Sequence, residues 1–505
     1  MIGMRLIRTI GVVLLAVGAG ALVGQSNSAA GKGQGTSSTG ASANSTAGVQ
    51  AVQAGQKALS ATVGPTSQGA TAESFKGSLV TDKVVAGVLD LSIDDAVQRG
   101  LRHNLGLILQ SSAEQNANGV RLQQLQQLLP TITGDANITV QQVNLAAFGL
   151  KFPGIKPIVG PFQVVDFRAY LNQSVVNVQA LENYIAAKHN FVGAKLTAAD
   201  ARDLVVLTVG NAYLLCIADA ARIEAVRAQM ATAQVSLNQA NDAHLAGTSP
   251  KLDVLRAQVD LQNEQQQLIA STNDLAKDKI ALARAIGLPL AQEFRLTDTA
   301  PYAALDNVDA DAAFAEALKN RKDLAAADEQ IKAARAQKTA AWAGQLPTAT
   351  VSGDFGDLGT TVGHSHGTYT ATAEVSAPIL QIAKNRGDQA VANANYETAR
   401  ARLSDEIQQV SQDVRSAVLD IQAAAKLVEA TRSNVDLAVE ALSEAQQRFK
   451  AGVSDTLSVS QAQTQAQLAN DQYISALYQH NVAKLALARA MGSAETHYKD
   501  YLGGK

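Results

Sequence analysis

The sequence predicts a mainly α-helical protein whose long antiparallel coiled-coil helices are joined to β-strands that form part of a membrane barrel. Three observations predict this architecture: an internal duplication, a seven-residue repeat of apolar positions in the long helical segments, and two-residue alternation in the segments that follow each Leu-Pro pair. A sustained seven-residue repeat is typical of coiled coils, and alternation is typical of strands with one apolar face.

Composition excludes several classes of protein. The 505 residues carry 42 basic and 45 acidic side chains, a net charge of −3, which gives no broad basic surface, so we expect no nucleic-acid partner. Aromatic residues make up only 4% of the chain, and small and aliphatic residues dominate instead, which favours closely packed helices. Cys216 is the single cysteine, so a disulfide within the chain is excluded.

Residues 1–24 are predicted to be a signal peptide. Arg5 and Arg8 precede an apolar run, residues 10–23, and small polar residues follow it. The alternative is a single membrane anchor, although the run is shorter than the about 20 residues that a spanning helix needs. We expect no other stretch to cross a bilayer as a helix, so insertion in a membrane would require strands. The absence of a nearby cysteine excludes a lipid-modified N-terminus.

Residues 25–90 are predicted to be a flexible tether, because Ser, Gly, Ala, Thr and Gln dominate its first two thirds. Two repeats follow, residues 91–287 and 309–492, separated by a linker, 288–308, and followed by a tail, 493–505. Ser92 aligns with Asp309, and Leu129-Pro130 aligns with Leu346-Pro347. Each repeat contains a helix, a pair of strands, a long helix, a turn and a final helix.

Apolar residues recur every seven positions in both long helical segments. Cys216 lies on this row, so we interpret it as a buried packing residue and not as a reactive thiol. A second row of mostly alanine, three residues behind, lets helix axes approach closely. The rows in the second repeat are Val414, Ile421, Val428, Val435, Leu442 and Phe449, with Ala417, Ala424, Thr431, Ala438 and Ala445; the first repeat has Val209, Cys216, Ile223, Met230, Leu237 and His244.

Each long helix is predicted to end in a tight turn, so each repeat contains an antiparallel helical hairpin. Gly247 and Gly452 suit the left-handed position after a helix, Ser249 and Ser454 suit N-caps, and Pro250 suits a first helical position. The helix before the first tip would be on the order of 100 Å long, the reach of a conduit more than of a globular domain. The predicted tips are Ala246, Gly247, Thr248, Ala451, Gly452 and Val453.

The segments after each Leu-Pro pair alternate between apolar and polar residues, as in a barrel wall with one lipid face and one lumen face. An amphipathic sheet packed on a core is the alternative, but the predicted helices are already committed to each other. Four strands cannot close a useful barrel, so several chains must contribute. We expect four polar residues to face the lumen: Asp135, Asn137, Asp354 and Glu374.

The chain resembles the TolC-like outer membrane efflux proteins over about residues 91–492. The resemblance is carried by Leu91-Ser-Ile-Asp-Asp-Ala96, by both Leu-Pro junctions, and by the Arg448–Ser454 segment followed by Gln461-Ala-Gln463. It implies a homotrimer in which each chain gives four strands to a twelve-stranded barrel and its helices to an α-helical tunnel. It also implies the outer membrane of a Gram-negative-type cell and its lipid, most of the mass in the periplasm, and tips that dock a periplasmic adaptor (membrane fusion) protein beneath an inner-membrane pump.

The resemblance further implies a closed entrance held by polar contacts near the tips. Asp253 matches the acidic residue of this lock, whereas Phe449 replaces a common tyrosine and Ser454 replaces an arginine that can complete a salt bridge. An equally acceptable interpretation makes Asp253 a first-turn acid that is stabilised by the helix dipole. The expected gating residues are Asp253, Phe449, Ser454, Asp455, Ser458 and Gln461.

The sequence contains no arrangement that predicts catalysis or a cofactor. His364 and His366 are a weak candidate for a metal site, because no Cys or carboxylate beside them completes a ligand set. We therefore expect a non-enzymatic, passive exit duct for small molecules or proteins, in a tripartite efflux or type I secretion system. The alternative is an exported periplasmic coiled-coil scaffold or adaptor without channel activity.

Overall fold

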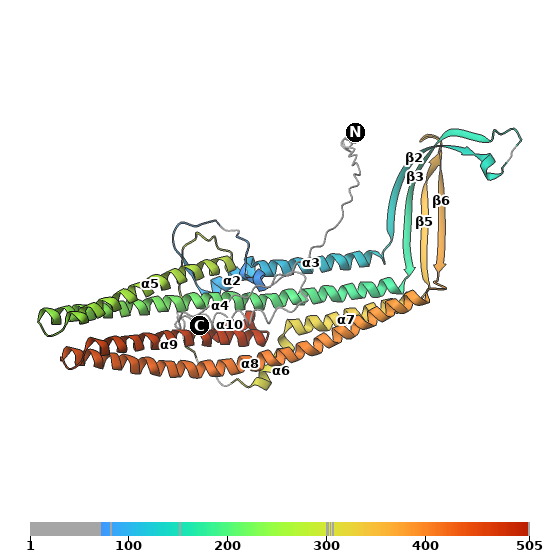
Figure 1. Cartoon of the computed structure of the whole chain (residues 1–505). Helices are drawn as coiled ribbons and strands as arrows, with labels where there is room; N and C mark the ends of the chain where they lie inside the picture. Colours follow the sequence, from blue (N-terminus) through green and yellow to red (C-terminus); the bar gives the residue numbers. More distant parts are fainter. Residues whose placement is uncertain are drawn as a thin grey trace, which may run out of the picture. The chain divides into compact units, whose positions relative to one another are not determined.

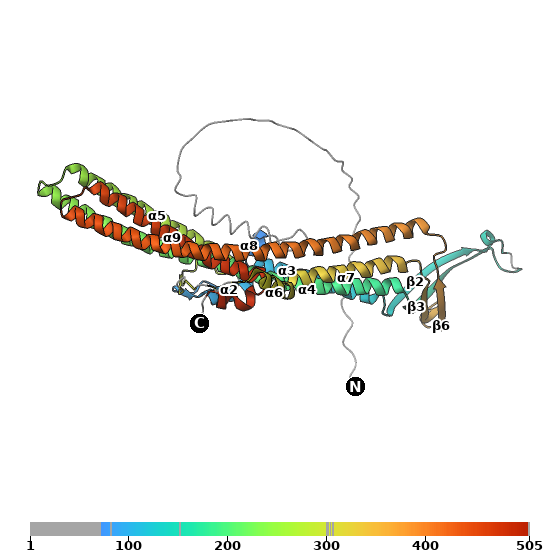
Figure 2. The same ribbon diagram turned by 90° about the horizontal axis from the view of Figure 1, so that it is seen from below.

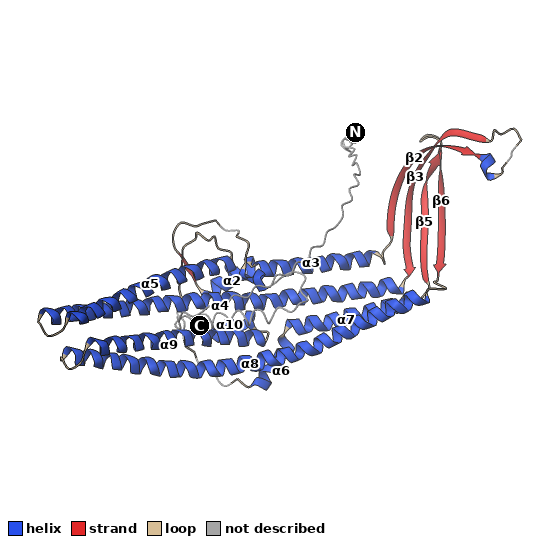
Figure 3. Cartoon of the chain, viewed as in Figure 1, coloured by secondary structure: helices blue, strands red, loops and turns tan. Residues whose placement is uncertain are grey.

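The computed structural model describes residues 72–80, 83–150, 153–298, 302–303, 305 and 308–502. The predicted signal peptide and residues 25–71 of the predicted tether lie outside the described residues. The chain divides into two units, Met1–Ala47 and Gly48–Lys505, and everything below concerns the second. Helices account for most of its described part, and strands are concentrated in one sheet (Figure 3).

The two repeats have the same order of elements, with four strands paired in the order β2-β3-β5-β6 (Figure 1). The first contains α2 (Ile93–His103), α3 (Leu105–Gln126), β2 (Thr131–Asn144), η2 (Leu145–Phe148), β3 (Ile158–Val176), α4 (Val178–Leu245) and α5 (Lys251–Ile286). The second contains α6 (Ala310–Asn320), α7 (Lys322–Ala343), β5 (Thr348–Gly359), β6 (Ser365–Ser376), α8 (Ile382–Lys450) and α9 (Thr456–Ala490).

Capping residues delimit both repeats. The side chain of Ser92 accepts a hydrogen bond from the Asp95 backbone N–H and caps α2, and the Asp309 side chain caps α6 by accepting one from the Asp311 N–H. At the other ends, Gly287 and Gly492 follow α5 and α9 with φ of +77° and +69°, in the left-handed region that favours glycine. These capping residues therefore mark where the helices of each repeat begin and end.

The long helices α4 and α8 span 68 and 69 residues, about 100 Å each at 1.5 Å per residue. The predicted seven-residue rows are confirmed as packed seams, because Val209, Cys216, Val414 and Ile421 are buried. Helix α4 packs against α3, α7, α5 and α9, and α8 packs against α7 and α9 (Figure 2). Burial raises the pKa of the Cys216 thiol above its ordinary value, as expected for a packing residue.

Helix α4 corrects one expectation from the sequence. We expected no stretch after the N-terminus to be apolar enough for a spanning helix, but α4 contains an 18-residue window with mean hydropathy 1.8. In this structure 67% of that window is buried against other helices of the chain. Packing within the bundle thus accounts for its apolar character.

The last part of the predicted tether is ordered, and the prediction is wrong there. Residues Ala72–Lys76 form a 3-10 turn, η1, whose Phe75 is buried against Gly106 at the start of α3. Strand β1 (Leu89–Leu91) then pairs in parallel with β4 (Phe294–Leu296) from the linker. The low-complexity composition that suggested mobility ends before these residues, and Phe75 supplies the apolar anchor.

The predicted tail contains a helix, α10 (Ala494–Leu502), that packs against α4 and α9. The Arg202 Nε atom of α4 lies 2.8 Å from a Glu495 carboxylate oxygen, and the Glu495 backbone N–H donates to Asp203. Tyr498 is buried in the same contact. The C-terminal segment is therefore part of the helical core.

Candidate functional site

The four-stranded sheet places all four predicted lumen residues on one face. Residues paired directly in antiparallel strands share a face. Asp135 pairs with Arg168 of β3, and Asp354 of β5 pairs with Tyr170 on the same face of β3. The register of β5 and β6 brings Glu374 to this face, and Asn137 follows Asp135 by two residues. The predicted alternation is therefore observed across all four strands.

The opposite face of the sheet is mostly apolar and largely exposed, with Val165 as a buried exception. Tyr369 of β6 is 79% exposed, and Ile132, Ile138, Phe355 and Val375 are also exposed. These side chains come from three strands but form one continuous surface, because the register aligns their alternation. An uncovered apolar surface of this kind marks a contact with lipid or with another protein.

Arg168 joins the two halves of the sheet, and the sequence analysis missed it. Its Nε donates to Asp166 (3.1 Å), its Nη1 binds the Asp354 carboxylate, and its Nη2 lies 3.2 Å from Thr368 Oγ1. One guanidinium thus contacts β3, β5 and β6 on the polar face. A signal was available, because Arg168 is the single Lys or Arg in the four strands.

The sheet has two free edges among the described residues. Strand β2 pairs with β3 alone, and β6 pairs with β5 alone. Each edge presents unpaired backbone donors and acceptors, which are the groups through which strands of separate chains associate. A barrel of useful width needs more strands than this chain supplies.

The two helical tips have the same backbone geometry. After α4, Gly247 has φ +74°, its N–H donates to the His244 carbonyl (3.0 Å), and the Thr248 N–H donates to the Ala243 carbonyl (2.9 Å). This pair of bonds is the Schellman motif, which satisfies carbonyl groups at a helix end. Gly452, with φ +72°, begins the same pair after α8. All six predicted tip residues are exposed.

The capping predictions at the tips are wrong by one residue. We expected Ser249 and Ser454 to be N-caps, but α5 begins at Lys251 after Pro250, which makes no side-chain cap bond. Helix α9 begins at Thr456, and Asp455 caps it by accepting a hydrogen bond from the Ser458 N–H (3.1 Å). Hydrogen bonds from Ser458 lower the pKa of the Asp455 carboxyl. The connection between the helices at each tip is therefore one residue longer than predicted.

Asp253 connects the two tips within one chain. Its Oδ1 accepts a hydrogen bond from Thr456 Oγ1 (2.6 Å), and its Oδ2 accepts one from Ser249 Oγ (2.6 Å). Arg256 Nη1 lies 3.8 Å from Oδ1. Both Asp253 and Thr456 are only 8% exposed, so the connection is shielded from water. Thr456 begins α9, and the sequence analysis did not single it out.

The other expected gating residues do not hydrogen-bond Asp253 in the described structure. Phe449 and Ser454 are half-buried, and Asp455, Ser458 and Gln461 are exposed. Farther from the tips, Gln463 of α9 donates to Ser236 of α4 (3.2 Å), a second polar connection between the hairpins.

Buried and half-buried carboxyl groups lie along the hairpins. Burial and the nearby Asp278 carboxyl raise the pKa of Asp219 on α4 to about 7. Burial likewise raises the pKa of Glu264 on α5 and of Asp471 on α9. Arg222 lies 3.2 Å from Asp219 and 3.6 Å from Asp471, so it bridges the two acidic positions.

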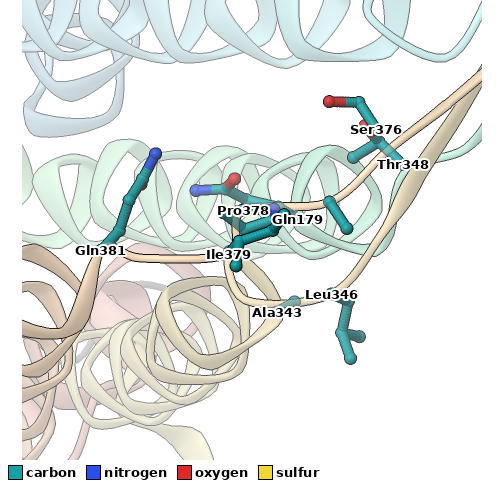
Figure 4. A pocket seen from close by; sticks show the side chains of 10 residues that line it. Gln179, Ala343, Leu346, Thr348, Ser376, Pro378, Ile379 and Gln381 are labelled. Carbon is teal, nitrogen blue, oxygen red and sulfur yellow. The ribbon is translucent and has the colours of Figure 1, made fainter.

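A pocket of about 440 Å³ lies where the sheet meets the helices (Figure 4). Gln179, Leu346, Thr348, Ile379 and Gln381 are among its lining residues, and none of its lining residues carries a titratable side chain. It is therefore unsuited to acid–base chemistry. Across the described part of the chain, no group of three or more His, Cys, Asp or Glu is placed to hold a metal ion.

Comparison with known proteins gives a consistent result. The family described as "Outer membrane efflux protein" matches residues 110–288 and 313–493, one segment in each repeat. The chain is 27% identical over 303 residues to the solvent efflux pump outer membrane protein SrpC of Pseudomonas putida, covering 58% of this chain and 63% of SrpC. It is 26% identical over 289 residues to the pyoverdine export outer membrane protein OpmQ of Pseudomonas putida, covering 56% of this chain and 61% of OpmQ.

The matches span less than two thirds of these relatives' own length. Solved structures match more completely. A membrane protein from Pseudomonas aeruginosa superposes with a TM-score of 0.72 at 20% identity, covering 82% of this chain and 99% of that one. The outer membrane protein VceC of Vibrio cholerae gives 0.69 at 19% identity, covering 79% and 96%. The predicted fold class, long helices joined to strands of a barrel, is confirmed.

Proposed function

The chain belongs to the outer membrane efflux protein family, and from this premise we propose that it is the outer-membrane channel of a tripartite efflux or type I secretion system. It serves as a passive exit duct for small molecules or proteins, and an inner-membrane pump supplies the energy. Its sheet lies in the outer membrane, and its helices extend into the periplasm.

The two unlike faces of the sheet are the observation that carries this proposal. Transfer of a large apolar side chain from water to an apolar phase is worth about 1.5–3 kcal/mol, so the five exposed apolar residues named above favour lipid by roughly 10 kcal/mol. The opposite face carries Asp135, Asn137, Asp354, Glu374 and Arg168, which suit a water-filled lumen. A water-soluble periplasmic scaffold would instead bury the apolar face of such a sheet.

The free edges of β2 and β6 support assembly from several chains. Three chains with four strands each give twelve strands, within the range of known membrane barrels. Pairing of β2 with β6 of the next copy satisfies the edge groups and leaves no open edge in lipid. The assembly that we propose is therefore a homotrimer.

The tips are proposed to dock the periplasmic adaptor protein. Their six residues are exposed, and the Schellman turns fix their backbone. We also propose that the Asp253–Thr456 hydrogen bond holds the inner end closed, in the place of a salt bridge. Ser458 and Gln461, exposed on α9, then line the aperture as neutral polar residues.

Conductance of the purified protein in planar bilayers tests the proposal. We expect stepwise currents from a detergent-extracted oligomer, and Asp135→Asn should lower the preference of the pore for cations. The matched control is Asp90→Asn, which removes an exposed carboxylate outside the four-stranded sheet and should leave selectivity unchanged. A water-soluble monomer without conductance would refute the proposal.

A further inference from the structure

The first strand hairpin is longer than the second. Pairing between β3 and β5 starts at Val165, but pairing between β2 and β3 continues to Asn144 and Ile158. The hairpin extension, described for residues 139–150 and 153–164, therefore runs about 20 Å past the end of β5. By contrast, only residues 360–364 connect β5 to β6. Figures 1 and 2 show the extension turning away from the four-stranded part of the sheet.

The extension is held in a defined conformation by backbone and side-chain hydrogen bonds. The β2–β3 register shifts between Gln141 and Val143, an irregularity of the kind that bends a strand pair. At its end the Asn144 side chain accepts a hydrogen bond from the Ala146 N–H (3.1 Å), which caps η2. The Leu145 N–H donates to the Pro157 carbonyl (2.7 Å) and closes the loop.

The end of the extension exposes large apolar side chains. Phe148 is 73% exposed, and Leu150, Ile155 and Ile158 are each about half exposed. Exposed loops of this length usually present polar residues to water. A cluster of four large apolar side chains at one loop therefore indicates an apolar partner.

The positive charge of the hairpin extension favours an anionic partner. Between Asp135 and Asp166 the only charged residues are Lys151 and Lys156, and Lys156 is exposed. Lysine beside aromatic and aliphatic residues, without acids, is typical of segments that lie on anionic lipid surfaces. A second copy of the extension would bring only like charges together, so charge disfavours that partner.

We propose that the hairpin extension binds an anionic lipid surface at the outer mouth of the barrel. The Phe148 ring and its aliphatic neighbours enter the boundary between headgroups and acyl chains, and the exposed Lys156 ammonium group pairs with a lipid phosphate. This proposal rests on the proposed function, because the sheet must first be the membrane wall.

Quenching by brominated lipids tests the proposal with the full-length chain in vesicles. Trp342 is the single tryptophan, so Trp342→Phe gives a background free of tryptophan emission. Into it we place Phe148→Trp, and separately Tyr369→Trp, an aromatic exchange on the exposed apolar face of β6. Leu245→Trp at the helical tip is the negative control. In vesicles of brominated phosphatidylglycerol we expect about twofold quenching of Phe148→Trp and Tyr369→Trp but none of Leu245→Trp.

Each outcome has a distinct meaning. If Tyr369→Trp is quenched and Phe148→Trp is not, the hairpin proposal is wrong while the membrane wall stands. If neither is quenched, the proposed function fails. Lys156→Glu should weaken the quenching of Phe148→Trp but leave that of Tyr369→Trp unchanged; unchanged quenching of Phe148→Trp would overturn the role of Lys156. A Phe148→Cys disulfide between copies, in a Cys216→Ala background, would show that a second chain is the partner and overturn the proposal.

Discussion

Removing the hydroxyl of Thr456 tests the connection between the two tips. Thr456→Val keeps the shape of the side chain but loses the 2.6 Å hydrogen bond to Asp253, whose carboxylate then keeps its bond from Ser249. A hydrogen bond to a charged, shielded group contributes about 1.5–3 kcal/mol. A loss of about 2 kcal/mol raises the ratio of separated to connected tips about 30-fold in each chain, because 1.4 kcal/mol is tenfold.

Single-channel recording in planar bilayers measures this change as the fraction of time in the open state. Thr456→Val should open the channel, and Thr456→Ser, which keeps the donor, should restore wild-type closure. Thr464→Val is the matched control, since among the described residues the Thr464 hydroxyl bonds only to the Ser460 carbonyl of its own helix. An open fraction that stays at the wild-type value in Thr456→Val, or that rises equally in Thr464→Val, would refute the reasoning.

Three further predictions follow from other positions. Gly247→Val should weaken adaptor binding measured by surface plasmon resonance, because a β-branched residue at φ +74° costs about 1–2 kcal/mol. The control variant Gly247→Asn should be tolerated, since asparagine adopts the left-handed conformation more readily. Unchanged drug export by the valine variant would count against this prediction. Lys484→Met should raise the melting temperature, because the Lys484 ammonium group is buried without a partner among the described residues and burial lowers its pKa to about 8. The destabilisation by the charged Lys484 is complete below pH 8 and disappears toward pH 10.5. The melting temperatures of wild type and Lys484→Met should therefore converge toward pH 10.5, and a difference that persists there would contradict the prediction. Asp219→Asn should flatten the pH dependence of stability between about pH 4 and 7. In this range the folded wild-type protein holds a proton on Asp219 that the unfolded chain releases, so the wild type loses stability as the pH rises. An identical slope of stability against pH in both proteins would exclude the effect.

The sequence predicted those features that depend on local periodicity. The apolar rows through Val209 and Val414 follow from the pitch of a helix, and the faces of Asp135 and Asp354 follow from the two-residue period of a strand. The left-handed conformation of Gly247 follows from its lack of a Cβ atom. Each of these can be inferred from neighbours in the chain.

Contacts between distant segments could not be predicted in this way. Thr456 meets Asp253 across 203 positions, and Arg168 meets Asp354 across 186, so neither partner has a local signature. The order around Phe75 has the same origin, because its partner at Gly106 belongs to another element. The caps at Ser249 and Ser454 were misplaced because serine suits the N-cap by residue type, whereas the length of the turn, which sets the helix starts at Lys251 and Thr456, has no local signature in the sequence.

The seam of α8 is not uniformly packed along its length. Val414 and Ile421 are buried, but Val435, Leu442 and Phe449 are only half-buried as the helix nears its tip. Less apolar area removed from water means a smaller local free energy of opening, so amide hydrogens should exchange faster near the tip than in the middle of the helix. Helix α8 is thus packed most closely in its middle and opens more easily at its tip, so a partner that binds there separates the hairpins at a smaller free-energy cost.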